Sequence, residues 1–414
     1  QSTAVASSAY MTEWAVDNVN NRVYVGWYNS GYPYVCAGQY DQSTGTLVFG
    51  SATIVQSYGV YNNHTFGIEY DPSSDKVIVA YYGDPSYTHR GRLSTLTVNS
   101  SSLAMTVETS RTIGNGMNTG YRLRYHPVHQ RVILANNESS GGPGIRTIAI
   151  STNTINYSSA YTINSNYNGT NVPELVYDSN EQRMVCITSI GNNSTKAMVE
   201  SSFNSFNGQM TFGSQTTVPN ANGQSVTISA AYDATAQKIV VAYNQFNAGH
   251  NEFKRVCVGE VTGGTTNTIS FGNSQLIKNN PSARGRFYGS VYSNNSFVRV
   301  VYDPDAGQCF LVYSYEDNGT SGYILRVAPF TITSGTNFTI GTEHVVDSTA
   351  NLGANVNAVY MTSPNKIALG GHINSSSVRA YATSTTTTGS NVATFVGFSD
   401  AAYTNGQTAT IKLV

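Results

Sequence analysis

The amino-acid sequence predicts an all-β fold, a seven-bladed β-propeller with four antiparallel strands in each blade. Three observations lead to this prediction. One sequence pattern recurs seven times along the 414 residues, and its apolar runs are short, β-branched and bounded by polar turns, as strands are. No segment shows the sustained 3.6-residue periodicity of a helix. Repeated four-stranded units can close into a ring, which leaves only short sheet edges exposed.

Each repeat contains an apolar stretch, an aromatic residue or Val, a residue that is usually Asp, a polar turn, a basic residue and a β-branched run. The stretches IEYDPSSDKVIVAY and AAYDATAQKIVVAY show this pattern. We call the residue before the turn the anchor, and the anchors are Asp17, Asp71, His126, Asp178, Asp233, Asp303 and Met361. They predict one propeller domain over residues 1–390, with blades starting near residues 12, 66, 121, 173, 228, 298 and 356.

The anchors are interpreted as structural residues. An Asp at the start of a hairpin accepts hydrogen bonds from the N–H groups of its own turn, and a basic residue across the hairpin gives it a partner. That basic residue lies five positions after the anchor in six repeats, at Arg22, Lys76, Arg131, Arg183, Lys238 and Lys366, and Gln308 takes its place in the other. A calcium loop at Asp303 would need a later Glu that is absent, and Met361 replaces the carboxylate without disturbing the pattern. No metal site is therefore predicted.

A closed ring requires one end of the chain to complete the last blade. The seventh repeat has no evident fourth strand, so either the STAVAS stretch at 2–7 or the FVGF stretch at 395–398 is expected to supply it. Residues 391–414 are expected to form a C-terminal β-segment that acts as this closing strand or as an assembly contact. Because residue 1 is Gln, we also expect a preceding segment to have been lost by secretion, by maturation or by the choice of boundary.

Charge and apolar patterning exclude two classes of partner. The 22 basic and 23 acidic residues balance, and no run of Lys or Arg offers the positive surface that nucleic acid binding requires. The longest apolar runs are far shorter than the ~20 residues that span a bilayer, so membrane insertion is not expected.

The four cysteines, Cys36, Cys186, Cys257 and Cys309, lie in strand-like runs without a C-x-x-C spacing. They are expected to be buried free thiols, with Cys257 and Cys309 as the pair to test for a disulfide.

The sequence contains no catalytic motif, such as G-x-S-x-G, H-E-x-x-H or a P-loop. Charged residues do occur on the predicted innermost strands, two and four positions before the anchors, at Glu13, Glu69, Arg122, Arg124, Glu174 and Arg299. Their positions predict two ion pairs between adjacent blades, Glu69 with Arg124 and Glu174 with Arg122. Because an arginine lowers the pKa of a neighbouring carboxyl group, these pairs are interpreted as structural. The chain is therefore predicted to be no enzyme, with no catalytic residue and no cofactor.

A binding surface is predicted where the loops after the second and fourth strands of each blade emerge on one face. These loops are rich in aromatic residues, which stack on the apolar patches of sugars, and in amides, which satisfy sugar hydroxyls. A chain this rich in Tyr and Asn places them in loops whether or not they bind a ligand. Two interpretations of these loops therefore stay open, a ligand-binding face and a consequence of composition. The candidate ligand-binding residues are Tyr32, Tyr34, Tyr61, His64, Tyr87, His89, His250, Phe253, Arg286, Tyr288, Tyr315 and Tyr323.

The stretches YDPSSDKVIVAYYGD, YDPDAGQCFLVYSY and NTISFGNSQLI resemble repeats in virion proteins of marine bacteriophages, cyanophages included. The C-terminal ATFVGFSDAAYTNGQTATIKLV is similar to the short β-segment that closes such arrays. The resemblance implies a tail fibre, spike or capsid knob that attaches to the host through the loop face. Its implied location is the virion surface or the extracellular space. Its implied partners are other virion proteins and a host-surface glycan or protein, with a homo-oligomer possible. The alternatives are a secreted carbohydrate-binding lectin and a glycoside hydrolase or lyase that uses Glu69 or Glu174.

Overall fold

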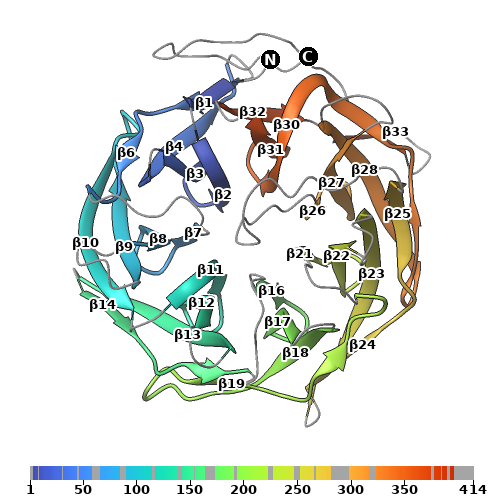
Figure 1. Ribbon diagram of the computed structural model, residues 1–414, viewed down its shortest axis with the longest axis horizontal. Coiled ribbons are helices and arrows are strands. Elements are labelled where there is room, and N and C mark those ends of the chain that lie inside the picture. Colours follow the sequence, from blue (N-terminus) through green and yellow to red (C-terminus); the bar gives the residue numbers. More distant parts are fainter. Residues whose placement is uncertain are drawn as a thin grey trace.

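The computed structural model shows a ring of antiparallel sheets around a central axis, and every regular element among its described residues is a strand (Figure 1). The all-β propeller prediction is therefore confirmed. The described residues are 3–7, 9–29, 31–43, 46–57, 66–83, 90–113, 117–138, 142–152, 154–163, 173–190, 194–221, 227–246, 252–264, 267–280, 298–316, 323–373, 377–383, 385–388 and 392–395. Among them no helix is long and apolar enough to cross a membrane.

The first three repeats follow one another around the ring. The first contains β2 (Ala9–Asp17), β3 (Arg22–Asn29), β4 (Tyr32–Asp41), β5 (Thr46–Phe49) and β6 (Thr53–Ile54). The second contains β7 (Gly67–Asp71), β8 (Lys76–Tyr82), β9 (Gly91–Val98) and β10 (Met105–Ile113). The third contains β11 (Met117–His126), β12 (Arg131–Glu138), β13 (Gly142–Ser151), β14 (Thr154–Tyr157) and β15 (Tyr161–Thr162).

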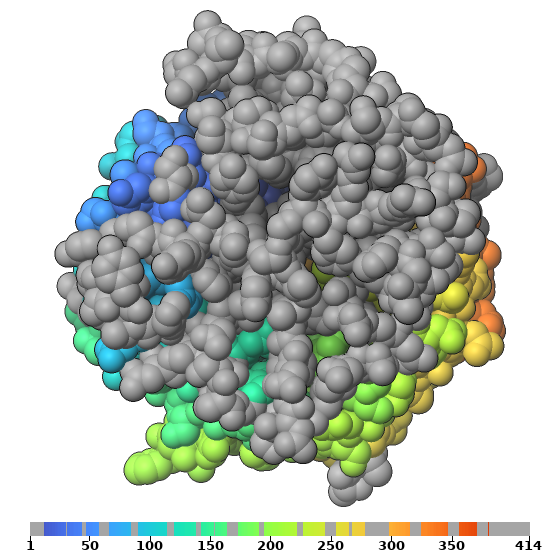
Figure 2. All heavy atoms as spheres, in the orientation of Figure 1, coloured from blue at the N-terminus to red at the C-terminus, as the bar shows by residue number. Residues whose placement is uncertain are grey.

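The remaining repeats complete the circle. The fourth contains β16 (Glu174–Asp178), β17 (Arg183–Ile190), β18 (Ser194–Phe203), β19 (Met210–Phe212) and β20 (Thr216–Thr217). The fifth contains β21 (Thr227–Asp233), β22 (Lys238–Phe246), β23 (Glu252–Thr262), β24 (Thr268–Phe271) and β25 (Gln275–Asn280). The sixth contains β26 (Val298–Asp303), β27 (Gln308–Glu316), β28 (Tyr323–Ser334) and β29 (Asn337–Ile340), and the seventh β30 (His344–Met361), β31 (Lys366–Ile373) and β32 (Ser377–Thr383). Figure 2 shows the described residues of successive repeats following one another around the rim.

The predicted hairpins form with the predicted register. Asp17 pairs with Arg22 across the first hairpin, and each later anchor pairs with the residue five positions after it, down to Met361 with Lys366. The Asp17 Oδ1 atom accepts hydrogen bonds from the N–H groups of Val19 and Asn20, each at 2.9 Å. Asp71, Asp178, Asp233 and Asp303 accept equivalent bonds. The Asp anchors therefore have the structural role that the sequence suggested, because they satisfy turn donors that have no strand partner.

The number of blades differs from the prediction, because the structure forms six blades and not seven. The strands of the sixth and seventh repeats lie in one eight-stranded sheet, joined by pairing between β28 and β30. In the first repeat, the short strand β6 pairs with the third strand and stays separate from β7. In β30 the corresponding stretch, from His344 to Leu352, continues without a break into the inner strand that pairs with β31. This uninterrupted strand is what merges the two repeats.

The N-terminus closes the ring. Strand β1 (Thr3–Ser7) pairs antiparallel with β32, with Thr3 opposite Ala380 and Ser7 opposite Ser377. Of the two predicted closing segments, STAVAS is thus the one used. Strand β34 (Val392–Phe395) pairs instead with β33 (Thr385–Thr388) in a separate hairpin. The rest of the predicted C-terminal segment, from residue 396 onward, lies outside the described residues.

Apolar side chains between adjacent sheets form the core. In one cluster Val240 and Val258 of the fifth repeat pack with Val300 and Phe330 of the sixth. All four cysteines are buried and free, as predicted, so Cys257 and Cys309 form no disulfide. The tyrosines before the anchors join neighbouring repeats, since the Tyr302 hydroxyl lies 2.8 Å from that of Thr235.

Candidate functional site

Six charged side chains from five inner strands meet at the centre of the ring. Glu13 lies on β2, Glu69 on β7, Glu174 on β16 and Arg299 on β26, while β11 supplies both Arg122 and Arg124. Residues two positions apart on a strand share a face, so positions two and four before each anchor both point towards the axis. This is the set that the sequence pattern identified.

Both predicted ion pairs form. The Arg124 Nη1 atom lies 3.6 Å from the Glu69 Oε2 atom, and the Arg122 Nε atom lies 3.2 Å from the Glu174 Oε2 atom. Arg124 also reaches the Glu174 Oε1 atom through Nη2, at 3.3 Å. Two inner strands of the third and fourth repeats are thereby connected by charge as well as by packing.

Contacts across the ring were not predicted. Arg122 of the third repeat donates a hydrogen bond to Glu13 of the first, and Arg299 of the sixth donates to the Glu13 Oε2 atom at 2.7 Å. Arg299 also donates to the Asn357 Oδ1 atom at 2.9 Å, and Asn357 donates to the Thr12 hydroxyl at 2.8 Å. Asn357 occupies the position four before its anchor, like Glu13 and Arg299, so the repeat alignment contained the signal.

A cavity of about 430 Å³ opens beside this cluster and is lined by Glu13, Glu69, Arg124 and Arg299, with Trp14 and Tyr360 among its walls. The side chains of Arg124 and Glu69 are 30% and 14% exposed, whereas those of Glu13 and Arg299 are each 5% exposed. A ligand in the cavity would therefore meet Arg124 and Glu69 first, with Glu13 behind them.

The two glutamates of the cavity have pKa values displaced in opposite directions. Burial raises the pKa of Glu69 to about 7, because the loss of hydration outweighs the opposing charge of Arg124, and the charge of Glu13 adds to the rise. Burial also acts to raise the pKa of Glu13, but the charges of Arg122 and Arg299 outweigh it and lower that pKa. The prediction that pairing with Arg would lower the pKa of Glu69 is wrong, because it neglected desolvation.

Such a divergence suits acid–base chemistry. A carboxyl group with a pKa near 7 exchanges a proton readily at neutral pH, whereas one with a lowered pKa stays a carboxylate. Two carboxyl groups in one site with displaced pKa values can therefore divide the roles of proton donor and charged partner.

The predicted loop-face residues are tested only in part. Tyr32 and Tyr34 are half-buried, and the Tyr34 ring stacks on Trp27 at a centroid separation of 5.8 Å. Three others lie on strands, but their side chains are outside the described part of the structure: Phe253 on β23, Tyr315 on β27 and Tyr323 on β28. The remaining ones lie outside the described residues altogether: Tyr61, His64, Tyr87, His89, His250, Arg286 and Tyr288. A ligand role for this set stays a prediction.

No family model matches the sequence, and no curated protein matches it. Solved structures do match its fold. The periplasmic gluconolactonase of Pseudomonas aeruginosa aligns with a TM-score of 0.51 at 11% identity, over 81% of this chain and 87% of that one. A variant of the NanB sialidase from Streptococcus pneumoniae aligns with a TM-score of 0.49 at 9% identity, over 92% of this chain and 69% of that one.

The gluconolactonase is an enzyme, and this likeness contradicts the prediction that the chain is no enzyme. That prediction rested on the absence of catalytic motifs within short stretches of sequence. In a propeller the side chains of a site come from different repeats, as Glu13 and Glu69 do here, so a motif search does not detect them. At these identities the likeness shows the fold, and the chemistry has to be argued from the residues.

Proposed function

We propose that the protein is a glycoside hydrolase that acts on an acidic glycan in the central cavity, with Glu69 as the proton donor. The observation that carries this proposal is the opposite displacement of the Glu69 and Glu13 pKa values in one cavity. Glycoside hydrolysis ordinarily needs one carboxylic acid and one carboxylate on either side of the scissile bond.

The reaction follows from the two protonation states. Protonated Glu69 gives its proton to the glycosidic oxygen, and the bond from that oxygen to the anomeric carbon breaks. The ionised carboxylate of Glu13 stabilises the positive charge that develops on the sugar ring. Water then supplies a hydroxyl group to the anomeric carbon, and its remaining proton returns to Glu69.

Preference for an acidic substrate follows from the charges around Glu69. When Glu69 is protonated, the three arginines of the cluster face only the carboxylates of Glu13 and Glu174, which leaves one net positive charge. Arg124 is the most exposed of the three, with 30% of its side chain open. Its guanidinium group can bind a carboxylate or sulfate through two parallel hydrogen bonds. The protonation that prepares Glu69 as an acid therefore also removes one of the two carboxylates that face Arg124, and Glu174 remains as the other.

Turnover on a panel of polysaccharides tests the proposal. The panel contains uronate-bearing, sulfated and neutral polymers, and the release of reducing ends is measured. Wild-type protein should cleave an acidic polymer, and Glu69→Gln should not. The matched control Glu108→Gln should retain activity, since Glu108 lies on the outer strand β10, where it pairs with Lys76. Equal activity of Glu69→Gln and wild type would contradict the proposal, as would the absence of cleavage across the whole panel.

We further infer, from the repeat resemblance alone, that this activity belongs to a virion surface protein that contacts a host glycan. Mass spectrometry of purified particles tests the location independently of the chemistry. Detection of the chain in virions would support it, and secretion of the chain without any particle would favour a free extracellular protein.

A further inference from the structure

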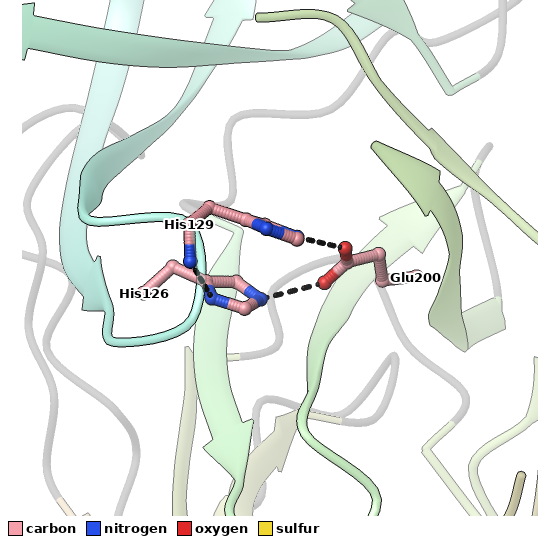
Figure 3. A group of neighbouring side chains, drawn as sticks. All are labelled: His126, His129 and Glu200. Carbon is pink, nitrogen blue, oxygen red and sulfur yellow. Dashed lines mark hydrogen bonds and ion pairs between the residues drawn. The ribbon is translucent and has the colours of Figure 1, made fainter. Parts of the chain in front are cut away.

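A second cluster of side chains lies outside the central cavity, where the third repeat meets the fourth (Figure 3). The His126 Nε2 atom lies 2.8 Å from the Glu200 Oε2 atom, and the His129 Nε2 atom lies 2.6 Å from the Glu200 Oε1 atom. Their ligand-type atoms all lie within 4.8 Å of one another. We propose that His126, His129 and Glu200 form a binding site for a divalent first-row transition metal ion.

Two of these residues, His126 and Glu200, differ in type from the residues at the same positions of the other repeats, and they face each other. His126 is the one anchor that is an imidazole. In the fourth repeat, Val185 lies seven positions after the anchor Asp178 and pairs with Val199 on the third strand. Glu200 is the residue after Val199, which defines an equivalent position in every repeat. The residues in the corresponding place of the seven repeats are Gly38, Leu96, Ile148, Glu200, Gly259, Phe330 and Thr383. Only the fourth repeat has an ionisable residue there, and it faces the only imidazole anchor.

The surroundings hold the three side chains in place. His126 and Glu200 are fully buried, and the His129 side chain is 15% exposed. The His129 ring lies between the rings of His126 and Phe203, with both centroid separations at 3.9 Å. The Glu200 Oε2 atom also accepts a hydrogen bond from the Met184 N–H group at 3.0 Å. A hydrogen bond that fixes a ligating carboxylate in this way is typical of metal centres.

The donor set favours a particular class of ion. Two imidazole nitrogens and one carboxylate oxygen suit Zn²⁺ and its first-row neighbours, whereas Ca²⁺ and Mg²⁺ prefer oxygen ligands only. The partial exposure of His129 leaves a path for water to a fourth position.

Metal binding requires a defined change in the hydrogen bonds. An ion bound at both Nε2 atoms replaces the protons that these atoms share with Glu200, and those protons move to the Nδ1 atoms or to solvent. The His126 Nδ1 atom accepts a long bond from the His129 N–H group, at 3.4 Å, and this contact has to open. Ligand atoms each about 2.0–2.1 Å from a tetrahedral ion lie farther apart than the present 2.6 and 2.8 Å, so the three groups must separate slightly.

The experiment uses chelator-treated full-length protein titrated with Co²⁺, followed by visible absorption, and with Zn²⁺, followed by calorimetry. Wild type should bind one equivalent of each, with the absorption of a tetrahedral Co²⁺ centre, and Zn²⁺ should raise its Tm. His129→Phe preserves ring stacking on His126 and Phe203 but removes one ligand, and it should bind at least tenfold more weakly.

A second variant distinguishes loss of metal binding from loss of folding. The double substitution His126→Asp with Glu200→Gly copies the next junction of the ring, where Asp178 is the anchor and Gly259 takes the corresponding place. It should fold and bind no stoichiometric metal. A wild-type protein that binds neither ion would overturn the proposal. The cluster would then be a set of hydrogen bonds that joins two repeats. Unchanged affinity in both variants would overturn it as well, because the bound ion would then lie elsewhere.

Discussion

Glu13 and Glu69 line one cavity at the centre of the ring, but Glu13 is bound by two arginines and Glu69 by one. The closer and more numerous contacts keep Glu13 ionised, whereas a single arginine 3.6 Å away does not compensate Glu69 for its burial. Ion pairing and desolvation act on both groups, and their balance determines which carboxyl group can carry a proton at neutral pH.

The first prediction concerns catalysis by Glu69. Glu69→Gln keeps the size of the side chain but removes its ability to give and take a proton, so kcat/KM should fall by about 10²–10⁴. Binding of the same acidic polymer should be retained, because Arg124 still faces the cavity. Activity and binding are measured on the same preparation by reducing-end release and calorimetry, and a variant that loses both together would point to a folding defect.

The second prediction concerns pH. Since the pKa of Glu69 is raised from 4.5 to about 7 in the folded chain, its contribution to stability is full below about 4.5 and is lost as the pH rises through about 7. Activity that needs protonated Glu69 should likewise decline as the pH rises through about 7. Thermal unfolding from pH 5 to 9 should show the Tm of Glu69→Gln gaining on that of wild type as the pH increases. Parallel curves would show that Glu69 is ionised throughout.

The third prediction concerns the ion pairs behind the cavity. Arg122→Met removes one of the arginine partners of Glu13 and of Glu174 while leaving both carboxylates buried, so the free energy of unfolding should fall by about 3 kcal/mol. Lys238→Met, which removes a pair with the half-exposed Glu260, should change it by about 0–1 kcal/mol. Denaturant unfolding of the two variants gives the comparison, and similar losses would mean that the central cluster is well hydrated.

Local patterns in the sequence were sufficient to predict the hairpins. Asp17 and Arg22 face each other across one tight turn, so six residues of sequence contain the whole pairing. The joining of β28 to β30 depends on how a long segment continues between repeats, which no turn signal specifies. The seven-blade count was therefore wrong, although the seven anchors were placed correctly.

The candidate sites were predictable only as far as they follow the repeat. Positions before the anchors identified Glu69 and Arg124, but the contact from Arg122 to Glu13 joins residues 109 apart in sequence and exists only because the ring closes. The desolvation that raises the pKa of Glu69 is likewise a property of the assembled core. His126 differs visibly from the Asp anchors in the sequence, whereas Glu200 lies at a third-strand position where the repeats share no residue type.

The last prediction concerns closure of the ring. Deletion of residues 1–7 removes β1, whose pairing with β32 is its contact with the last sheet, from Thr3 opposite Ala380 to Ser7 opposite Ser377. Each hydrogen bond of such a ladder contributes about 0.5–1.5 kcal/mol, so the shortened chain should lose at least ~2 kcal/mol of stability. The freed edge of β32 is also a template for pairing with another chain. Thermal unfolding and light scattering measure the two effects, and an unchanged Tm with a monomeric chain would show that β32 tolerates an open edge.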